Sequence, residues 1–97
     1  MNNPGESVER IKLVIAIISD ADASPVIDQL TNRHYRVTRV ASTGGFLHRG
    51  NVTLLIGVEE AHVQAVISIL RETCRTSDPN QHRATIFVVD ASHFEQI

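Results

Sequence analysis

Cysteine, aromatic residues and long apolar runs are all scarce in this sequence of 97 residues, and each scarcity excludes a class of protein. The single cysteine, Cys74, permits no disulfide within the chain and favours a reducing, cytoplasmic location. The longest apolar run, residues 13–18, is far shorter than the roughly 20 residues that cross a bilayer. The polar start carries no signal-peptide pattern, so we expect no membrane insertion.

Charge of one sign is also lacking. Nine lysine and arginine residues against eleven aspartate and glutamate residues give a formal net charge of −2, whereas nucleic-acid-binding domains are normally basic. Only 4% of residues are aromatic, and the expected central strands offer no aromatic side chains on which RNA bases could stack. We therefore expect no nucleic-acid partner.

What is present is an ordinary globular composition, with 42% hydrophobic and 21% charged residues, in a chain long enough for one small domain. Residues 1–10 have no periodicity and are interpreted as a flexible leader; residues 11–97 form the domain. Enrichment in isoleucine and valine predicts a strand at residues 11–19, and alternation predicts one at residues 35–41. Two further strands are expected at residues 52–58 and 84–89.

Two helices are expected between these strands. The first is predicted to begin with Ser24 as its N-cap and Pro25 at its first helical position. The second follows Glu59 and Glu60 and has one apolar face, made of Val63, Val66, Ile67, Leu70 and Cys74. The order β-α-β-β-α-β predicts an α+β fold, the ferredoxin-like sandwich, with both helices on one face of the sheet.

The expected strands at residues 11–18 and 52–58 are apolar on both faces. In a lone two-layer sandwich, one of those faces would meet water. We therefore expect the bare face to be covered by another copy of the chain.

A search for reactive groups finds few candidates. The five histidines show no metal-ligand spacing, no serine stands in a nucleophile elbow, and Cys74 falls on an apolar helix face. We expect no catalytic residue, no metal and no cofactor.

The glycine-containing loop at residues 42–51 is the exception. Gly44 and Gly45 let an anion approach backbone N–H groups, and the neighbouring Phe46 and Leu47 offer apolar surfaces to a purine. The alternative is a simple turn whose Phe46 fills the core.

Polar residues on either side of this loop extend the candidate site. Arg36 and Thr38 are two apart on a strand and share a face, where they supply a charge and a hydroxyl. Asn51, at the far end of the loop, carries an amide that can read the edge of a base. The alternative is a solvated strand face.

The stretch Arg36-Val-Thr-Arg-Val-Ala-Ser-Thr-Gly-Gly-Phe-Leu-His-Arg-Gly-Asn51 resembles the signature of the PII-like cyclic di-AMP receptor family. The usual form is approximately Arg-x-Thr-Lys-Leu-Ala-Thr-Thr-Gly-Gly-Phe-Leu-x-x-Gly-Asn, followed by a strand that ends in Gly-Val. Here that strand ends in Gly57-Val58. Residues 12–20, residues 84–90 and the Phe-x-Gln ending at Phe94 and Gln96 are also similar to the family.

The resemblance implies a PII-like homotrimer of ferredoxin-like subunits that binds the second messenger cyclic di-AMP in clefts between subunits and catalyses no reaction. Signal transduction would follow from loop rearrangement that acts on a downstream partner protein. Carried over by position, the ligand-binding residues are Arg36, Thr38, Gly44, Gly45, Phe46, Leu47, Asn51, Gly57, Phe87 and Gln96. The connection at residues 75–83 is shorter than is usual in the family and has no glycine.

Two other functions compete. A PII-type module could hold ATP or ADP in the same cleft, although a triphosphate favours more cations than Arg36 and Arg39 supply. A small ferredoxin-like enzyme, such as an acyl-phosphate hydrolase, could use Arg36 and Asn51, but the glycine loop follows the wrong strand for that scheme.

Overall fold

The structure, a computed structural model, describes residues 10–40, 50–75, 83–91, 93, 95 and 97. Its elements in chain order are β1 (Ile11–Ser19), α2 (Asp20–Asn32), β2 (Arg36–Val40), β3 (Asn51–Glu59), the 3-10 turn η1 (Glu60–His62), α3 (Val63–Thr73) and β4 (Ala84–Asp90). The predicted order is confirmed, and each predicted strand end lies within one residue of the observed one.

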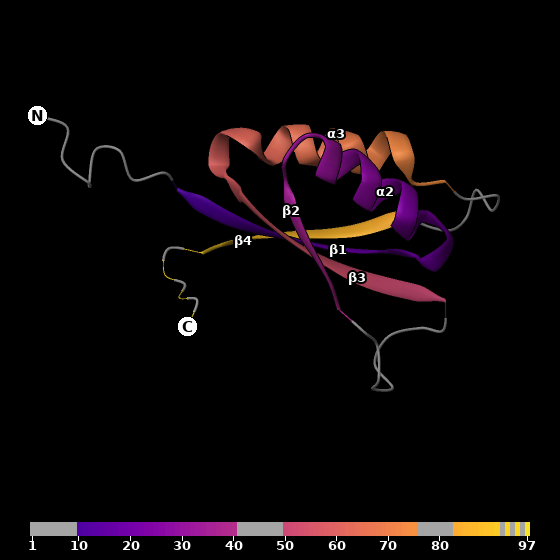
Figure 1. Ribbon diagram of the computed structural model, residues 1–97, viewed down its shortest axis with the longest axis horizontal. Helices are drawn as coiled ribbons and strands as arrows, with labels where there is room; N and C mark the ends of the chain where they lie inside the picture. Colours follow the sequence, from indigo (N-terminus) through magenta and orange to yellow (C-terminus); the bar gives the residue numbers. More distant parts are fainter. Residues whose placement is uncertain (1–9, 41–49, 76–82, 92, 94, 96) are drawn as a thin grey trace, which may run out of the picture.

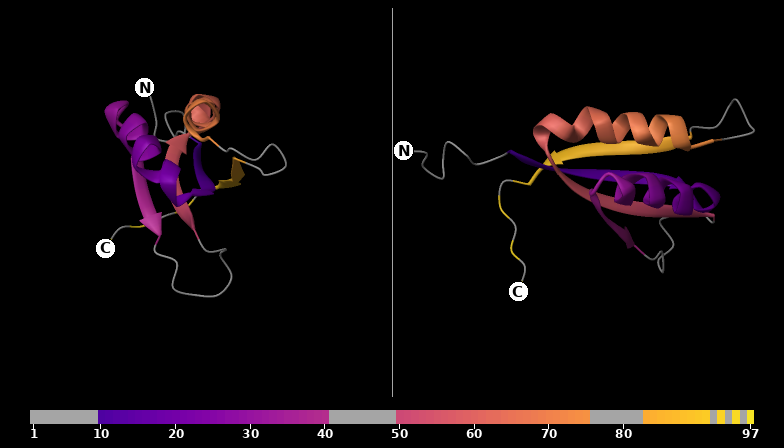
Figure 2. Two further views of the ribbon diagram at one scale, coloured as in Figure 1. Left: turned by 90° about the vertical axis from the view of Figure 1, so that its right-hand side faces the viewer. Right: turned by 45° about the horizontal axis from the view of Figure 1, so that its top comes forward.

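The four strands form one antiparallel sheet in the order β2-β3-β1-β4. Helices α2 and α3 both lie on one face of it, as Figures 1 and 2 show from three directions, and no helix among the described residues lies on the other face. This is the α+β arrangement of a ferredoxin-like sandwich.

The core lies between the sheet and the helices. Side chains alternate along a strand, so every second residue of β1 and β3 points to the helices, and these positions are almost fully buried. The helices bury Val26, Leu30, Val66 and Leu70 against them, and Cys74 is buried just after α3. The apolar face predicted for the second helix is confirmed, although Ile67 is only partly buried and Ile69 also joins the core.

The predicted start of the first helix is wrong. Helix α2 begins directly after β1, with Ser19 as its N-cap: the Ser19 hydroxyl oxygen accepts a hydrogen bond from the Ala21 N–H at 3.3 Å. Pro25 lies inside the helix, and Ser24 precedes it there. The earlier start is favoured because Ser19 satisfies an unpaired N–H and because Asp20 and Asp22 place carboxylates at the positive end of the helix.

Candidate functional site

The sheet face opposite the helices is ordered into rows of side chains that lie directly across from one another. Strand pairing defines three rows, each read from β2 through β3 and β1 to β4: Arg36, Gly57, Leu13 and Val89; Thr38, Leu55, Ile15 and Phe87; Val40, Thr53, Ile17 and Thr85. In these rows the charged side chain is Arg36 of β2, with the hydroxyl of Thr38 beside it, whereas the facing residues of β1, Leu13, Ile15 and Ile17, are all apolar.

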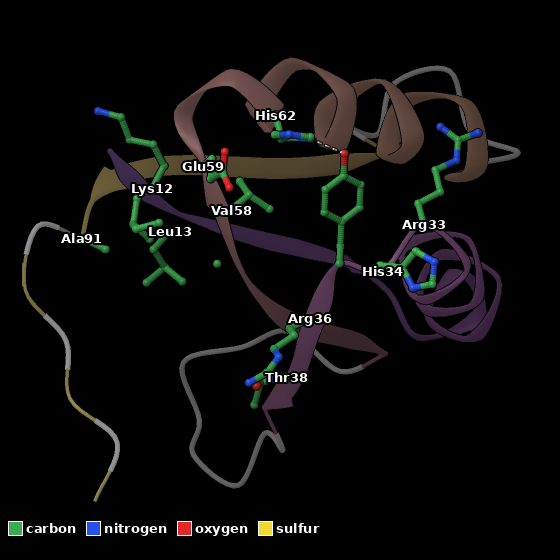
Figure 3. A pocket seen from close by; sticks show the side chains of 13 residues that line it. Lys12, Leu13, Arg33, His34, Arg36, Thr38, Val58, Glu59, His62 and Ala91 are labelled. Carbon is green, nitrogen blue, oxygen red and sulfur yellow. Dashed lines mark hydrogen bonds between the residues drawn. The ribbon is translucent and has the colours of Figure 1, made fainter. Parts of the chain in front are cut away.

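Three predicted site residues come together in one cavity on this face. Arg36 lies opposite Gly57, and Thr38 follows two residues along β2 on the same side, as the alternation predicted. All three line a cavity of about 760 Å³ whose floor also includes Leu13 (Figure 3). A methyl group added at Gly57 would meet no atom within 4 Å, so the absence of a side chain leaves this part of the cavity open.

The cations that line the cavity differ in their partners. The Lys12 ammonium forms ion pairs with Asp90 and, at 3.7 Å, with Glu60. Its hydrogen bond to Asp90 raises the pKa of Lys12 and lowers the pKa of the Asp90 carboxyl. Arg36 forms no salt bridge with any carboxylate in the part of the chain that the structure describes, so its charge is available to an anion.

The wall of the cavity on the helix side was not found from the sequence. It includes Tyr35 and His62, whose side chains are hydrogen bonded at 3.0 Å between the tyrosine hydroxyl and Nδ1 of the histidine. Tyr35 stands immediately before Arg36, and His62 ends the turn that follows β3. The two residues are 27 positions apart, and no local spacing could have linked them.

Comparison with known proteins also assigns this chain to a family of binding proteins. Residues 11–81, most of the chain, match the family model described as "Cyclic-di-AMP receptor". The chain belongs to this family. It is also similar to the crystal structure of a functionally unknown protein from Pediococcus pentosaceus ATCC 25745, with 33% sequence identity, a TM-score of 0.76, and coverage of 93% of this chain and 100% of that one.

The family match contains Arg36, Thr38 and Gly57 and ends before β4. Two other predicted site residues lie within the described structure but away from the cavity. Phe87 shares a row with Thr38 but is three strand spacings away, roughly 14 Å at ~4.8 Å each. Asn51 is six residues from Gly57 along β3, roughly 20 Å at ~3.3 Å per residue. Arg36 and Asn51 are therefore not neighbours within one chain.

The remaining predicted site residues lie outside the described residues: Gly44, Gly45, Phe46, Leu47 and Gln96. Within the described ranges, no group of three or more histidine, cysteine, aspartate or glutamate side chains is placed to hold a metal ion. In the same ranges, no helix has both the length and the apolar character needed to cross a membrane.

Proposed function

We propose that this protein binds cyclic di-AMP and that Arg36, Thr38 and Gly57 form the part of the site supplied by β2 and β3. The observation that carries the proposal is the direct pairing of Arg36 with Gly57 on one cavity, inside the family match. This pairing sets a guanidinium group beside an open floor, where a phosphate can be bound while a flat base lies close to the backbone.

The chemistry of the ligand fits these groups. Cyclic di-AMP carries two phosphate groups and two purines, so it needs cationic and hydroxyl donors together with apolar surfaces. The exposed guanidinium of Arg36 and hydroxyl of Thr38 supply the donors, and the partly buried Leu13 and Leu55 supply apolar surface on the neighbouring strands. The predicted contacts of Gly44, Gly45, Phe46 and Leu47 belong to the same site.

One chain offers only part of the site. Phe87 is 52% exposed and Val89 is 41% exposed on the face without helices, and Leu13, Ile15 and Ile17 lie only partly buried between them and β3. We propose that copies of the chain cover this apolar face in a homotrimer. The partner subunit's Phe87 and Gln96 then complete a cleft that begins at Arg36, since Phe87 of the same chain lies too far away. Asn51 is assigned to the same clefts.

The output of binding follows from where the site lies. Strand β2 ends at Val40, immediately before residues 41–49, which include four of the assigned ligand contacts. Ligand binding would favour one arrangement of residues 41–49, and the altered surface would change the affinity for a downstream partner protein in the cytoplasm. The protein would act as a binding module and would leave the ligand unchanged.

Isothermal titration of the full chain tests the proposal, with cyclic di-AMP, cyclic di-GMP and ATP as ligands and with light scattering to give the oligomeric mass. We expect tight binding of cyclic di-AMP alone, near one ligand per chain, by a trimer. Binding of ATP in preference to cyclic di-AMP would instead support the alternative PII-type module. Absence of binding by all three ligands would reject the proposed function.

A further inference from the structure

The hydrogen bond between Tyr35 and His62 lies in the wall of the cavity, on the side of the sheet that carries the helices. The tyrosine hydroxyl and Nδ1 of the histidine are 3.0 Å apart, and the two rings meet edge to face at 72° with centroids 5.8 Å apart. Both side chains line the cavity, and the dashed line in Figure 3 marks the bond. With the ring proton on Nε2, the hydroxyl donates to Nδ1.

Tyr35 is held by its backbone as well. Its N–H donates to the carbonyl of Leu30 at 3.0 Å, which joins the start of β2 to the last turn of α2. The preceding residue, His34, has a positive φ of 67°, so the chain reverses there before β2 begins. Tyr35 is therefore the point at which the direction of β2 is set.

His62 connects this point to the neighbouring strand. It closes η1, the turn between β3 and α3, and lies five residues after Gly57. The bond from Tyr35 to His62 thus joins the beginning of β2 to the turn after β3. These are the two strands that supply Arg36 and Gly57 to the cavity.

Besides its pairing with β3, strand β2 is restrained within the described residues by Val37, which packs against the core, and by the ion pair of Arg39 with Asp20, but neither contact lies at the first residue of the strand. It has five residues, lies at the edge of the sheet and, among the described strands, pairs with β3 alone, and four of its five residues are exposed. Arg36, the first of them, is covalently bonded to Tyr35. A restraint on Tyr35 is consequently a restraint on the backbone from which the Arg36 guanidinium reaches the cavity.

We propose that Tyr35 and His62 are a positioning pair that holds β2 in the orientation in which Arg36 meets the ligand; this rests on the proposed binding of cyclic di-AMP. A bond that only stabilised the fold would act equally on the empty and the occupied protein and would leave the dissociation constant unchanged. A positioning bond orders Arg36 before the ligand arrives, so its loss adds an ordering cost to binding.

The variants Tyr35→Phe and His62→Ala each remove the bond, and Tyr35→Phe keeps the ring. We expect cyclic di-AMP to dissociate from each variant with a constant roughly three- to tenfold higher, the size of one hydrogen bond. The double variant should bind no more weakly than either single variant, because the second change has no bond left to remove. His62→Asn, which returns an acceptor near the position of Nδ1, should recover affinity.

Hydrogen exchange tests the positioning role of Tyr35 and His62 independently of whether the protein binds cyclic di-AMP. Without any ligand, Tyr35→Phe should speed amide exchange in β2 and leave the central strand β1 unchanged. If the wild-type protein does not bind cyclic di-AMP but this exchange pattern is found, the proposed function is rejected while the restraint on β2 stands. Unchanged exchange in β2, or a dissociation constant in Tyr35→Phe equal to that of the wild type, would overturn the positioning role.

Discussion

Arg36 and Gly57 face each other directly across strands β2 and β3, so a guanidinium side chain lies beside a position that has no side chain at all. The antiparallel register creates this relationship: 21 positions separate the two residues in the chain. Gly57 is also the only glycine of β3, and a methyl group placed on it would enter open space. The strand would therefore accept a side chain at position 57, whereas the open cavity requires that none is present.

Gly57→Val should separate the tolerance of the strand from the requirement of the cavity. A β-branched residue suits a strand, and the open space around Gly57 accepts the side chain, so we expect a thermal midpoint equal to or slightly above that of the wild type. The added side chain fills the cavity, so affinity for cyclic di-AMP should fall at least about tenfold, more than one lost hydrogen bond explains. Calorimetry and thermal unfolding measure the two effects.

Thr53→Val is the matched control, because Thr53 lies on the same strand and face, two rows from Gly57 and outside the cavity lining. It should leave affinity unchanged. Equal loss of affinity in the two variants would show that the effect comes from the strand as a whole and not from the open floor of the cavity.

The start of α2 gives a second prediction. Ser19 caps the helix, whereas Ser24 is an exposed residue within it. Ser19→Ala should therefore lower the free energy of unfolding by about 1 kcal/mol, the usual cost of a lost N-cap. Ser24→Ala should leave it unchanged or raise it slightly, because alanine favours helix interiors. Urea unfolding of both variants measures this, and the reverse order of stability would place the helix start at Ser24 after all.

Cys74 is expected to react slowly. Burial, and to a lesser degree the negative charge of Asp22, raise its pKa from 9.0 to about 11, and the thiolate is the reactive form. In a thiol assay at pH 8, the native protein should label far more slowly than the same protein in guanidinium chloride. Labelling at the same rate in both states would contradict the buried position.

The same shift of pKa predicts loss of stability in alkali. A thiol whose pKa is higher in the folded state than in the unfolded state favours folding below the unfolded value. This contribution declines as pH rises from about 9 to about 11, because only the unfolded chain ionises readily there. Cys74→Ala should unfold with a weaker pH dependence in this window. Parallel pH profiles for variant and wild type would show that another group is responsible.

The ion pair between Lys12 and Asp90 predicts how the stability of the fold depends on pH in acid. The hydrogen bond from Lys12 lowers the pKa of Asp90, so the carboxylate favours the folded state above its ordinary pKa of 3.8 and loses this effect as pH falls below that value. Asp90→Asn should therefore reduce the dependence of stability on pH between about 5 and 3, measured by thermal unfolding. Because the pair is surface-exposed, high salt should also reduce the difference between variant and wild type. A difference that persists in high salt would argue against a charge effect.

The strands could be predicted from sequence because enrichment in isoleucine and valine, and in β2 the two-residue alternation, are local properties, and the ends of β1 were predicted without error. The start of α2 was missed because Ser19 and Ser24 are both plausible caps, and the choice depends on how tightly the helix follows β1. The register between β2 and β3 could not be predicted from the sequence either. No local pattern places Arg36 opposite Gly57 or Tyr35 beside His62, because both relationships arise only when the sheet and its helices pack.

The most direct test of cyclic di-AMP binding at this cavity compares Arg36→Ala with Arg39→Ala by isothermal titration. Arg39 lies on the same strand with its side chain on the opposite face, where it pairs with Asp20 at 2.6 Å. Loss of charge-assisted hydrogen bonds should weaken binding by Arg36→Ala at least about tenfold, while Arg39→Ala keeps the affinity of the wild type. Equal affinities for Arg36→Ala and the wild-type protein would contradict the assignment of the site.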